Sequence, residues 1–337
     1  MSYLGIDLHT NCLTVCYRTA QGQERTRTYA LKDLSAFAKT LRKRDRLAVE
    51  ATGNTRWFVA QIRRRVKEVV VVDPNKFEVI TKSVHKTDKH DAKTLAYFLS
   101  KDMLPKARMK EEQTAQLQSL AATRDQLVKQ RTALINKIHN VLNGHGLKMK
   151  KESLSSAKGL ATLWAYDWPA IVKVELQVLA DQIRSLNDSI KHLDGELTDR
   201  GQKLPGHENL TSIKGIGDKS ATILLSVIGN VKDFENEHKL AAYFGIVPRV
   251  SNSNETQHHG RITKRGSKLG RTTLVQCTLV AKRYSPYLRR FYEKIQRRRG
   301  SGKAIIATAR KFLGIIYQTL NNKWIFEDFP NFVLAES

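Results

Sequence analysis

The chain has 337 residues, 41% of them hydrophobic and 27% charged, a balance typical of a globular protein with two or three domains. Its 58 lysines and arginines outnumber its 32 acidic residues, and the net charge of +26 favours a polyanionic partner, most simply nucleic acid. The three cysteines show no zinc-ligand spacing, and we expect reduced thiols in a cytosolic protein. The start of the sequence lacks a signal-peptide pattern, and no apolar run approaches the ~20 residues that cross a bilayer, so we expect no membrane partner.

Residues 1–108 alternate between strand and helix patterns. Hydrophobic alternation predicts three strands first and then a helix–strand alternation. In chain order, the expected elements are strands at 3–7, 13–18 and 25–31, a helix at 34–44, a strand at 46–53, a helix at 56–67 and a strand at 68–74. This order favours an α/β domain of the RNase-H/RuvC-like type.

Residues 109–200 have the pattern of a long helical arm. Leucine or valine recurs every seven residues from Leu120 to Val141, and a stricter three-and-four spacing runs from Leu176 to Leu197. Such heptads predict a coiled coil. A hairpin of two antiparallel helices within one chain and pairing between chains fit the pattern equally well.

Residues 201–337 predict a third, helical domain with a polar, basic loop at 249–271. Within it, KGIGDKS (214–220) places a Gly-x-Gly turn between two amphipathic helices. Gly215 and Gly217 would let backbone N–H groups approach a phosphate, and a purely structural packing role is the alternative of about equal weight.

Four acidic residues form the candidate metal site. Asp7 and Glu50 end two apolar strands, and Asp88 and Asp91 lie three residues apart on an expected helix, so their carboxylates share one face. A lone DxxD pair is usually a solvated face. Because the strand ends of an RNase-H-like sheet meet at one edge, the four acids together predict a site for one or two Mg²⁺ ions.

The motifs resemble those of one large bacterial insertion-sequence family, the DEDD transposases that act as bridge-RNA-guided serine recombinases and are related to Piv-type DNA invertases. GID, EATG and KTD–KHDA–KTLA carry the resemblance near the N-terminus. Residues 210–229 are similar to the family's helix-hairpin-helix segment, and residues 244–274 to its catalytic-serine segment. These motifs follow the family's order along nearly the whole chain.

The resemblance implies a RuvC-like domain (1–108), a coiled-coil arm (109–200) and a transposase domain (201–337). It implies that Asp7, Glu50, Asp88 and Asp91 bind Mg²⁺, with Mn²⁺ as a substitute. In the family the catalytic serine follows a GLxPR-like stretch by four residues, so the resemblance implies Ser253, four residues after GIVPR (245–249).

One departure concerns this serine segment. Family members commonly place glycine after the serine, whereas Asn254 and Glu255 follow here, and Ser251 stands two residues away. Spacing favours Ser253 over Ser251, and an ordinary polar loop is the alternative for both.

The implied activity is that of a transposase, which cuts and rejoins donor and target DNA through a covalent phosphoserine. A non-coding bridge RNA would guide it, a homodimer or tetramer would hold both DNA sites, and the protein would lie in the bacterial cytoplasm at the nucleoid. Two other functions remain open from the residues. One is a metal-dependent Holliday-junction-type endonuclease without a serine nucleophile, and the other is a non-catalytic nucleic-acid-binding scaffold.

Basic residues of the third domain form the expected nucleic-acid surface. Arginine binds phosphates well, and interleaved aromatic residues can stack on bases, although they can equally be the buried face of a basic helix. The expected contacts are Lys214, Gly215, Gly217, Lys219, Arg261, Lys264, Arg265, Lys268, Arg271, Arg289, Arg290, Arg297, Arg298 and Arg299.

Overall fold

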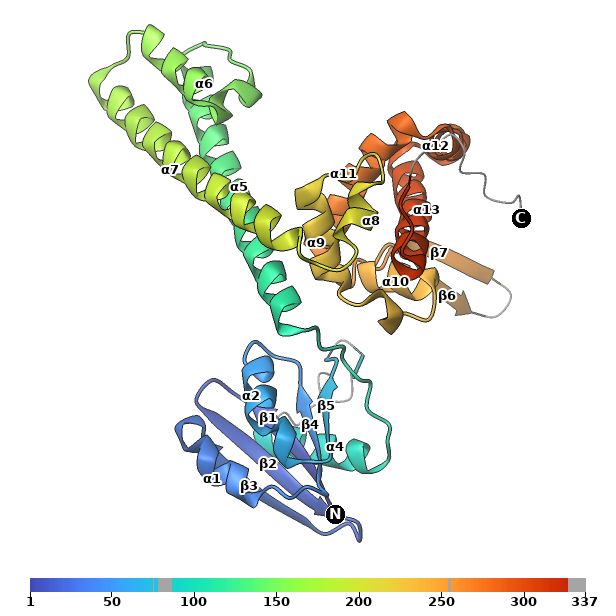
Figure 1. Cartoon of the computed structure of the whole chain (residues 1–337). Helices are drawn as coiled ribbons and strands as arrows, with labels where there is room; N and C mark the ends of the chain where they lie inside the picture. The colour runs from blue at the N-terminus through green and yellow to red at the C-terminus, as the bar shows by residue number, and fades with distance from the viewer. Residues whose placement is uncertain (75, 78–86, 254–255, 327–337) are drawn as a thin grey trace. The chain divides into compact units, whose positions relative to one another are not determined.

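The structure is a computed structural model that describes residues 1–74, 76–77, 87–253 and 256–326. Contacts divide the chain into two compact units, Met1–Met109 and Lys110–Ser337 (Figure 1). The second unit contains both the expected arm and the expected transposase domain, and the division into three domains stays a prediction. No helix of the described residues is long and apolar enough to cross a membrane.

The first unit is built on one sheet of five strands in the order β3-β2-β1-β4-β5. β1, β2 and β3 pair antiparallel, whereas β4 and β5 run parallel to β1. The strands are β1 (Ser2–Leu8), β2 (Cys12–Thr19), β3 (Glu24–Ala30), β4 (Arg46–Glu50) and β5 (Glu68–Val72). This arrangement confirms the RNase-H-like α/β domain that the strand and helix patterns predict.

Helices cover both faces of this sheet because hydrophobic side chains point to both sides. Leu4 and Ile6 of β1 pack on Phe37 of α1 (Leu34–Thr40) and on residues of α2 (Thr55–Ile62). On the opposite face, Val70 and Val72 pack against α4 (Asp88–Ser100). The resulting three layers bury the central strands β1 and β4, whereas β3 stays largely exposed.

Two helices of this unit are shorter than predicted, and the strands expected at 46–53 and 68–74 end at Glu50 and Val72. The helix expected at 34–44 ends at Thr40, because the buried carboxylate of Asp45 accepts hydrogen bonds from the backbone N–H groups of Arg42 and Ser2 and closes a turn. The helix expected at 56–67 ends at Ile62, and a short 3₁₀ turn over Arg63–Arg65 follows it. Local periodicity extends through both segments, and hydrogen bonds to distant residues override it.

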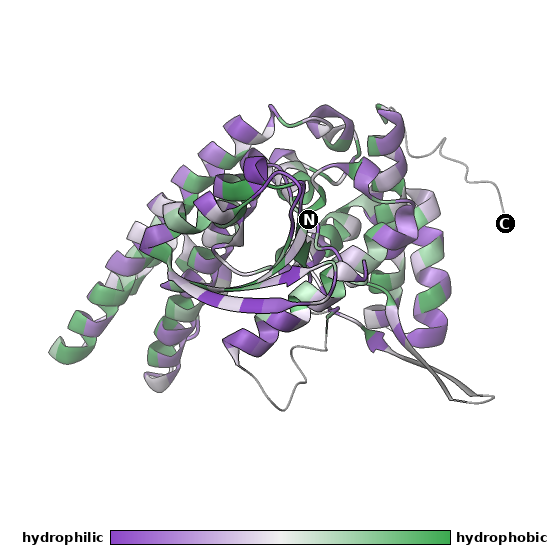
Figure 2. Ribbon diagram, turned by 90° about the horizontal axis from the view of Figure 1, so that it is seen from below, coloured by the Kyte–Doolittle hydropathy of each residue, from purple (hydrophilic) through white to green (hydrophobic). Residues whose placement is uncertain are grey.

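The arm consists of α5 (Glu112–Gly144) and α7 (Ala170–Gly201), which pack along each other within the chain. Figure 2 shows hydrophobic and hydrophilic residues alternating along the helices. The deepest seam positions of α7 are Leu176, Ile183, Ile190 and Leu197. The intrachain hairpin is therefore the alternative observed, while pairing between chains stays a prediction.

Between α5 and α7, the chain folds into a small cap. It comprises η3 (Lys151–Ser155), α6 (Ala157–Ala161) and η4 (Thr162–Ala165). Leu154, Leu160 and Trp168 pack there against apolar residues of α5 and α7. The cap gives the end of the arm a hydrophobic core of its own.

The rest of the second unit is a helical body around α13, with one β-hairpin. Phe312, Leu313 and Ile316 of α13 are fully buried in its core. The elements are α8 (His207–Thr211), α9 (Asp218–Ile228), η5 (Val231–Asp233), α10 (Glu237–Phe244), β6 (Pro248–Ser253), β7 (Thr256–Ile262), α11 (Lys268–Tyr284), α12 (Pro286–Arg299) and α13 (Ser301–Asn322).

The prediction of a loop over residues 249–271 is wrong for most of that range. β6 and β7 pair antiparallel with Ser251 opposite His258, and α11 begins at Lys268. These strands contain mostly polar residues, so they lack the apolar alternation that predicts a strand. Cross-strand backbone hydrogen bonds form without that signal.

An ion-pair cluster joins the arm to the helical body. Asp194 of α7 accepts two hydrogen bonds from the Arg124 guanidinium of α5, at 2.8 and 3.2 Å, and lies 3.2 Å from the Nζ atom of Lys219 of α9. Burial raises the pKa of Asp194, but the two cations lower it more, so the net pKa lies below its ordinary value. The carboxylate is thus stabilised in its charged form by residues of two other helices.

We predict that Asp194→Asn lowers the free energy of unfolding by about 1 kcal/mol at neutral pH, because it leaves both cations without their charged partner. Since the folded-state pKa is depressed, this stabilisation is present above the unfolded-state pKa of ~4 and is lost as the pH falls through the folded-state pKa. Denaturant unfolding at several pH values measures it. Asp199→Asn, at an exposed position of the same helix, is the matched control; an equal effect of both changes would contradict the role of the cluster.

Candidate active site

The first two acids of the predicted cluster lie at the carboxyl ends of neighbouring parallel strands. Gly5 pairs with Ala48 and Ile6 with Val49, so the next positions, Asp7 on β1 and Glu50 on β4, are neighbours at one edge of the sheet. Side chains alternate along a strand, which puts these acids on the same sheet face as Gly5 and Ala48. That is the face covered by α4.

Gly5 allows α4 to lie unusually close to β1. A Cβ atom at this position would come within 2.0 Å of the Ala92 carbonyl oxygen and 2.4 Å of the Ala96 nitrogen. Any larger residue would therefore have to displace the helix backbone. The close approach brings the first turn of α4 toward Asp7, two residues further along β1.

The start of α4 carries the other two acids. The Thr87 hydroxyl accepts a hydrogen bond from the His90 N–H and caps the helix. Asp88 is exposed, whereas Asp91 is only 8% exposed. Acidic residues in the first turn of a helix also interact favourably with the helix dipole. This interaction explains in part why Asp88 and Asp91 lie there.

A histidine completes the group of possible ligand atoms. His9 Nε2 lies 3.1 Å from Asp7 Oδ2 and 3.4 Å from Asp88 Oδ1. Among the residues that the structure describes, Asp7, His9 and Asp88 form the group whose ligand atoms all lie within 4.8 Å of one another. Glu50, at the neighbouring strand end, and Asp91, whose charge acts on Asp7, stand outside this group.

His9 is not among the four acids that the sequence predicts as metal ligands. The signal that could have found it is its spacing from Asp7, because a residue just beyond a strand end can turn back toward the strand's last side chains. Here the Asn54 side chain donates a hydrogen bond to the His9 carbonyl oxygen at 2.9 Å and holds the turn.

The electrostatics of the group favour a cation. Burial raises the pKa of Asp7, and repulsion from Asp88 and Asp91 raises it further. The nearby His9 lowers this pKa, but the net pKa stays above its ordinary value. Burial lowers the pKa of His9, but Asp7 and Asp88 raise it more, so the net pKa is raised. Both pKa shifts reflect the concentration of negative charge at this partly buried edge of the sheet.

The residues fit a divalent metal ion. Carboxylate oxygens are the ligands that hard cations such as Mg²⁺ and Mn²⁺ prefer, and a positive ion would offset the repulsion between the acids. Imidazole nitrogen suits Mn²⁺ better than Mg²⁺. The four predicted metal ligands thus lie at or beside one edge of the sheet, with His9 added, while their individual roles stay predictions.

The predicted catalytic serine lies on the hairpin of the second unit. Ser253 is the last residue of β6 and pairs with Thr256, and Ser251 pairs with His258. The side chains of both serines lie outside the part of the structure that is described. The assignment of Ser253 as nucleophile therefore stays a prediction.

Arg271, whose place on the nucleic-acid surface stays a prediction, makes internal hydrogen bonds at the base of this hairpin. Its guanidinium Nη1 donates hydrogen bonds to the carbonyl oxygens of Phe244 and Gly266, each at 3.2 Å. Burial lowers the pKa of Arg271. Its contacts hold together the chain segments that enter and leave the hairpin.

The two glycines of the Gly-x-Gly turn differ in their surroundings, because Gly215 is packed and Gly217 is exposed. Gly215 has a φ of +111° and packs on α11, since a Cβ there would meet the Ala281 nitrogen at 2.7 Å. Gly217 is exposed at the N-terminus of α9, with open space beside it. Lys219 is drawn toward Asp194, and Lys214 is exposed with its Nζ 5.9 Å from the ring centre of Tyr284.

Most of the remaining basic residues are exposed. α12 buries one side chain, Leu288, and its aromatic residues are half-buried with lysines against their rings, as Lys311 is against Phe291 at 4.5 Å. The exposed members of the predicted set are Arg261, Lys264, Arg265, Lys268, Arg289, Arg290, Arg297, Arg298 and Arg299.

We predict that Gly5→Ala weakens Mn²⁺ binding by about tenfold or more, because the added methyl group moves α4 and its acids away from Asp7. It should also cost ~1–3 kcal/mol of stability through overpacking. Isothermal titration with Mn²⁺ measures the first effect and denaturant unfolding the second. Gly195→Ala is the control, since a Cβ at that helical position meets open space; an unchanged Mn²⁺ affinity in folded Gly5→Ala protein would contradict the prediction.

Comparison with known proteins places the chain. Residues 4–146 match the family model of the DEDD transposases of IS110, and residues 207–293 match that of the transposase IS116/IS110/IS902 family. The chain is 27% identical to the transposase for insertion sequence element IS1111A of Coxiella burnetii, over 75% of this chain and 71% of that protein. It is 26% identical to the pilin gene-inverting protein of Moraxella lacunata, over 97% and 98% of the two chains. The chain is therefore a DEDD transposase of the IS110/IS116 family and a homologue of the pilin gene-inverting proteins.

Proposed function

We propose that the protein is a DNA recombinase that cuts and rejoins strands through a covalent phosphoserine at Ser253, supported by a Mg²⁺-binding acidic cluster. The observation that carries this proposal is the grouping of Asp7, His9 and Asp88 at the edge of an RNase-H-like sheet, in a chain whose two ends both match transposase families. Glu50 and Asp91 adjoin the group and complete the proposed ligand set.

The acidic cluster holds the cation, which, when bound, stabilises negative charge on the scissile phosphate and on the leaving oxygen. Asp7 and Asp88 provide oxygen ligands from two different elements, and α4 fixes their separation through its contact with Gly5. His9 holds both carboxylates in orientation through its Nε2 atom. Mn²⁺ is expected to substitute for Mg²⁺.

The serine supplies the covalent chemistry. The Ser253 Oγ atom attacks phosphorus and loses its proton, one P–O bond of the DNA strand breaks, and the departing DNA oxygen takes up a proton to become a free hydroxyl. The phosphodiester energy is kept in the Ser–O–P bond. A second hydroxyl can then attack that phosphorus and reseal a strand without ATP.

Two features of the chain support DNA and a guide RNA as partners. The net charge of +26 suits polyanions, and exposed arginines on α12 offer phosphate contacts. Guidance by a non-coding bridge RNA rests on the family resemblance. Since recombination holds donor and target DNA together, we propose a homodimer or tetramer in which the acidic cluster of one domain meets Ser253 of another.

The alternative is a metal-dependent endonuclease of the Holliday-junction type, in which the acids activate water and Ser253 is incidental. The specific observation in its favour is that Asp7, His9 and Asp88, which form the acidic group at the sheet edge, all belong to the first unit. Hydrolysis leaves no protein on the DNA, and this difference separates the two reactions.

We predict that incubation with DNA carrying the flanks of the gene, their transcript and Mg²⁺ yields protein-linked DNA on a denaturing gel. Ser253→Ala and Asp88→Asn should each reduce the adduct at least ~10³-fold, since one removes the nucleophile and the other part of the metal site. Omitting the transcript tests the guide RNA.

Matched controls make the result specific. Ser251→Ala removes the neighbouring hydroxyl, and Asp33→Asn changes an exposed acid of the same domain; both should keep the adduct. Cut DNA without an adduct, unaffected by Ser253→Ala, would establish the endonuclease reaction in place of the recombinase.

A further inference from the structure

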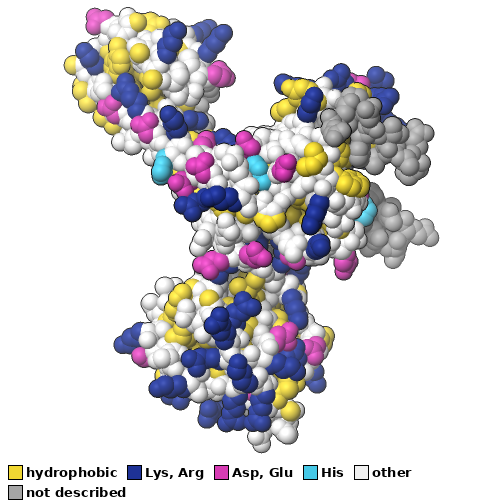
Figure 3. Space-filling model, in the orientation of Figure 1, with side chains coloured by type: hydrophobic (Ala, Val, Ile, Leu, Met, Phe, Trp, Pro, Cys, Tyr) yellow, Lys and Arg dark blue, Asp and Glu magenta, His cyan; other side chains and the backbone are white. Residues whose placement is uncertain are grey.

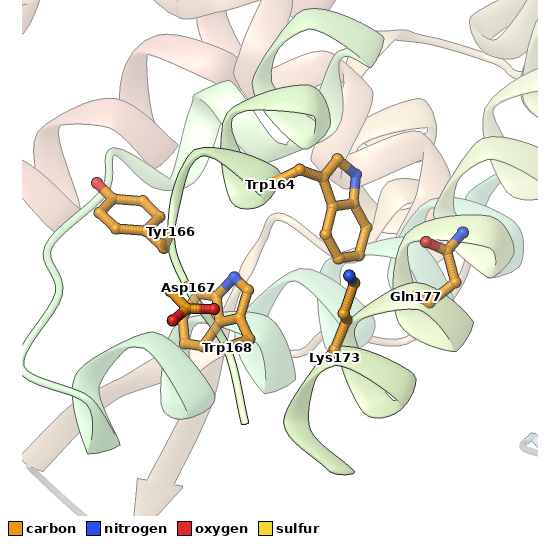
Figure 4. Close-up of a pocket in the computed structure, with 6 residues that line it drawn as sticks. All are labelled: Trp164, Tyr166, Asp167, Trp168, Lys173 and Gln177. Atoms are coloured by element: carbon orange, nitrogen blue, oxygen red, sulfur yellow. The ribbon is translucent and has the colours of Figure 1, made fainter. Parts of the chain in front are cut away.

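The end of the arm contains an aromatic hollow that the proposed recombination chemistry does not use. It measures about 360 Å³, near the small end of the ~300–1,000 Å³ typical of sites for small ligands. Its lining residues are Trp164, Tyr166, Asp167, Trp168, Lys173 and Gln177 (Figure 4). The first four come from η4 and the segment after it, and the last two lie one turn apart on α7.

One wall of the hollow is rigid and aromatic. The Trp168 indole Nε1 donates a hydrogen bond to the Leu163 carbonyl oxygen at 2.7 Å, and the side chain is only 8% exposed. The Tyr166 ring leans on it, with centroids 5.9 Å apart, yet Tyr166 stays 40% exposed. Trp168 is thus a fixed support for the Tyr166 ring, and a supported ring loses less entropy than a free one when a planar ligand stacks on it.

The polar groups of the hollow are of two kinds. Asp167 offers carboxylate oxygens, and the Gln177 amide nitrogen donates to Asp181 at 2.9 Å, which leaves its carbonyl oxygen as an acceptor on the side of the hollow (Figure 4). Lys173 extends toward the Trp164 indole and brings a positive charge (Figure 4). Acceptors for N–H groups, aromatic faces and one cation are the combination that a nucleotide requires.

The surroundings of the hollow are also basic. Between residues 145 and 173, the sequence contains five lysines but only two acids. Figure 3 shows hydrophobic side chains gathered at the end of the arm, with lysine and arginine side chains beside them. Phosphates on either side of a bound base would therefore meet positive charge.

We propose that this hollow binds an unpaired base of single-stranded nucleic acid, stacked on Tyr166 and Trp164, with Lys173 near its phosphate. The inference deepens the proposed function, on which it rests for the choice of nucleic acid as partner. It does not depend on the serine or on the metal site, because every residue of the hollow belongs to the arm.

A protein partner would fit the hollow less well. An apolar stripe of Ile171, Val174 and Val178 lies exposed on the same turns of α7, and a second copy of the chain could cover it. Such a contact would bury the stripe, but it would also bury the Asp167 carboxylate and the Lys173 ammonium at a cost in desolvation. A base uses these groups and leaves the phosphate in water.

Tryptophan fluorescence of the full-length protein tests the proposal. Replacing Trp57 and Trp324 with Phe leaves the two tryptophans of the hollow as reporters, because the chain has four. Titration with single-stranded oligonucleotides of eight thymidines or eight uridines should quench them, whereas a duplex of that length should not. The two single strands separate a DNA ligand from an RNA ligand.

Variants at the hollow make the test specific. Tyr166→Ala should weaken the quenching titration by about fivefold or more, through loss of one stacking contact, and Tyr166→Phe should restore it. Lys173→Gln should weaken it at low salt, and Lys158→Gln, an exposed lysine outside the hollow, should not. Thermal unfolding verifies that each variant is folded.

Photo-crosslinking identifies the place of contact directly. A single strand carrying 5-iodouracil should attach to the tryptic peptide that follows Lys158 and ends at Lys173, which contains Trp164, Tyr166 and Trp168. The adduct should disappear in Tyr166→Ala, while adducts on other basic segments remain.

Three outcomes would overturn the proposal. The first is equal quenching by the duplex, and the second is crosslinked adducts confined to other peptides. The third is a fluorescence change that depends on protein concentration in the absence of oligonucleotide and is lost in Tyr166→Ala. That third result would indicate that a second copy of the chain occupies the hollow. Ser253→Ala and Asp7→Asn should leave quenching unchanged, so loss of the recombinase reaction and loss of this site are distinguishable.

Discussion

The contact between Gly5 and the backbone of α4 is the constraint on which the candidate active site depends. With no side chain at Gly5, the helix lies against β1 at the level of Ala92 and Ala96. Leu95 and Leu99 then pack beside Val70 and Val72 and fix the helix on the sheet. Asp88, in the first turn of α4, thereby lies near the end of the strand that carries Asp7, with His9 close to both acids.

The negative charge of the acids at this edge of the sheet is energetically unfavourable without a compensating positive charge. It contrasts with the net charge of +26 of the whole chain. The carboxylates of Asp7 and Asp88 both lie close to a single His9 nitrogen, at 3.1 and 3.4 Å. DNA phosphates would be repelled by such an edge. A bound divalent cation reverses the sign of the local field, and so the same residues that repel a phosphate can accept one.

The second unit separates two kinds of nucleic-acid contact. Exposed arginines on α12 suit phosphates, which position a nucleic acid but carry no sequence information. The hollow at the end of the arm has the aromatic faces and acceptors suited to a base. The paired helices of the arm, joined to the helical body through Asp194, provide a stiff support for that contact.

The sequence by itself determined the parts that depend on local pattern. Alternating hydrophobic residues and short apolar runs predict all five strands of the sheet, and heptads predict the two arm helices. The strand ends at Asp7 and Glu50 and the spacing of Asp88 and Asp91 identify the acids of the candidate site. These signals are periodic, and neighbouring residues alone generate them.

Tertiary structure decided whatever depends on residues distant in the chain. The closeness of α4 to Gly5, the place of His9 between two acids, and the engagement of Arg271 and Lys219 in internal contacts all arise between separate elements. The hairpin at Pro248–Ile262 forms through backbone pairing of polar strands, which have no hydrophobic period to read. The aromatic hollow exists because the cap folds back on α7, and this is a property of packing rather than of local sequence.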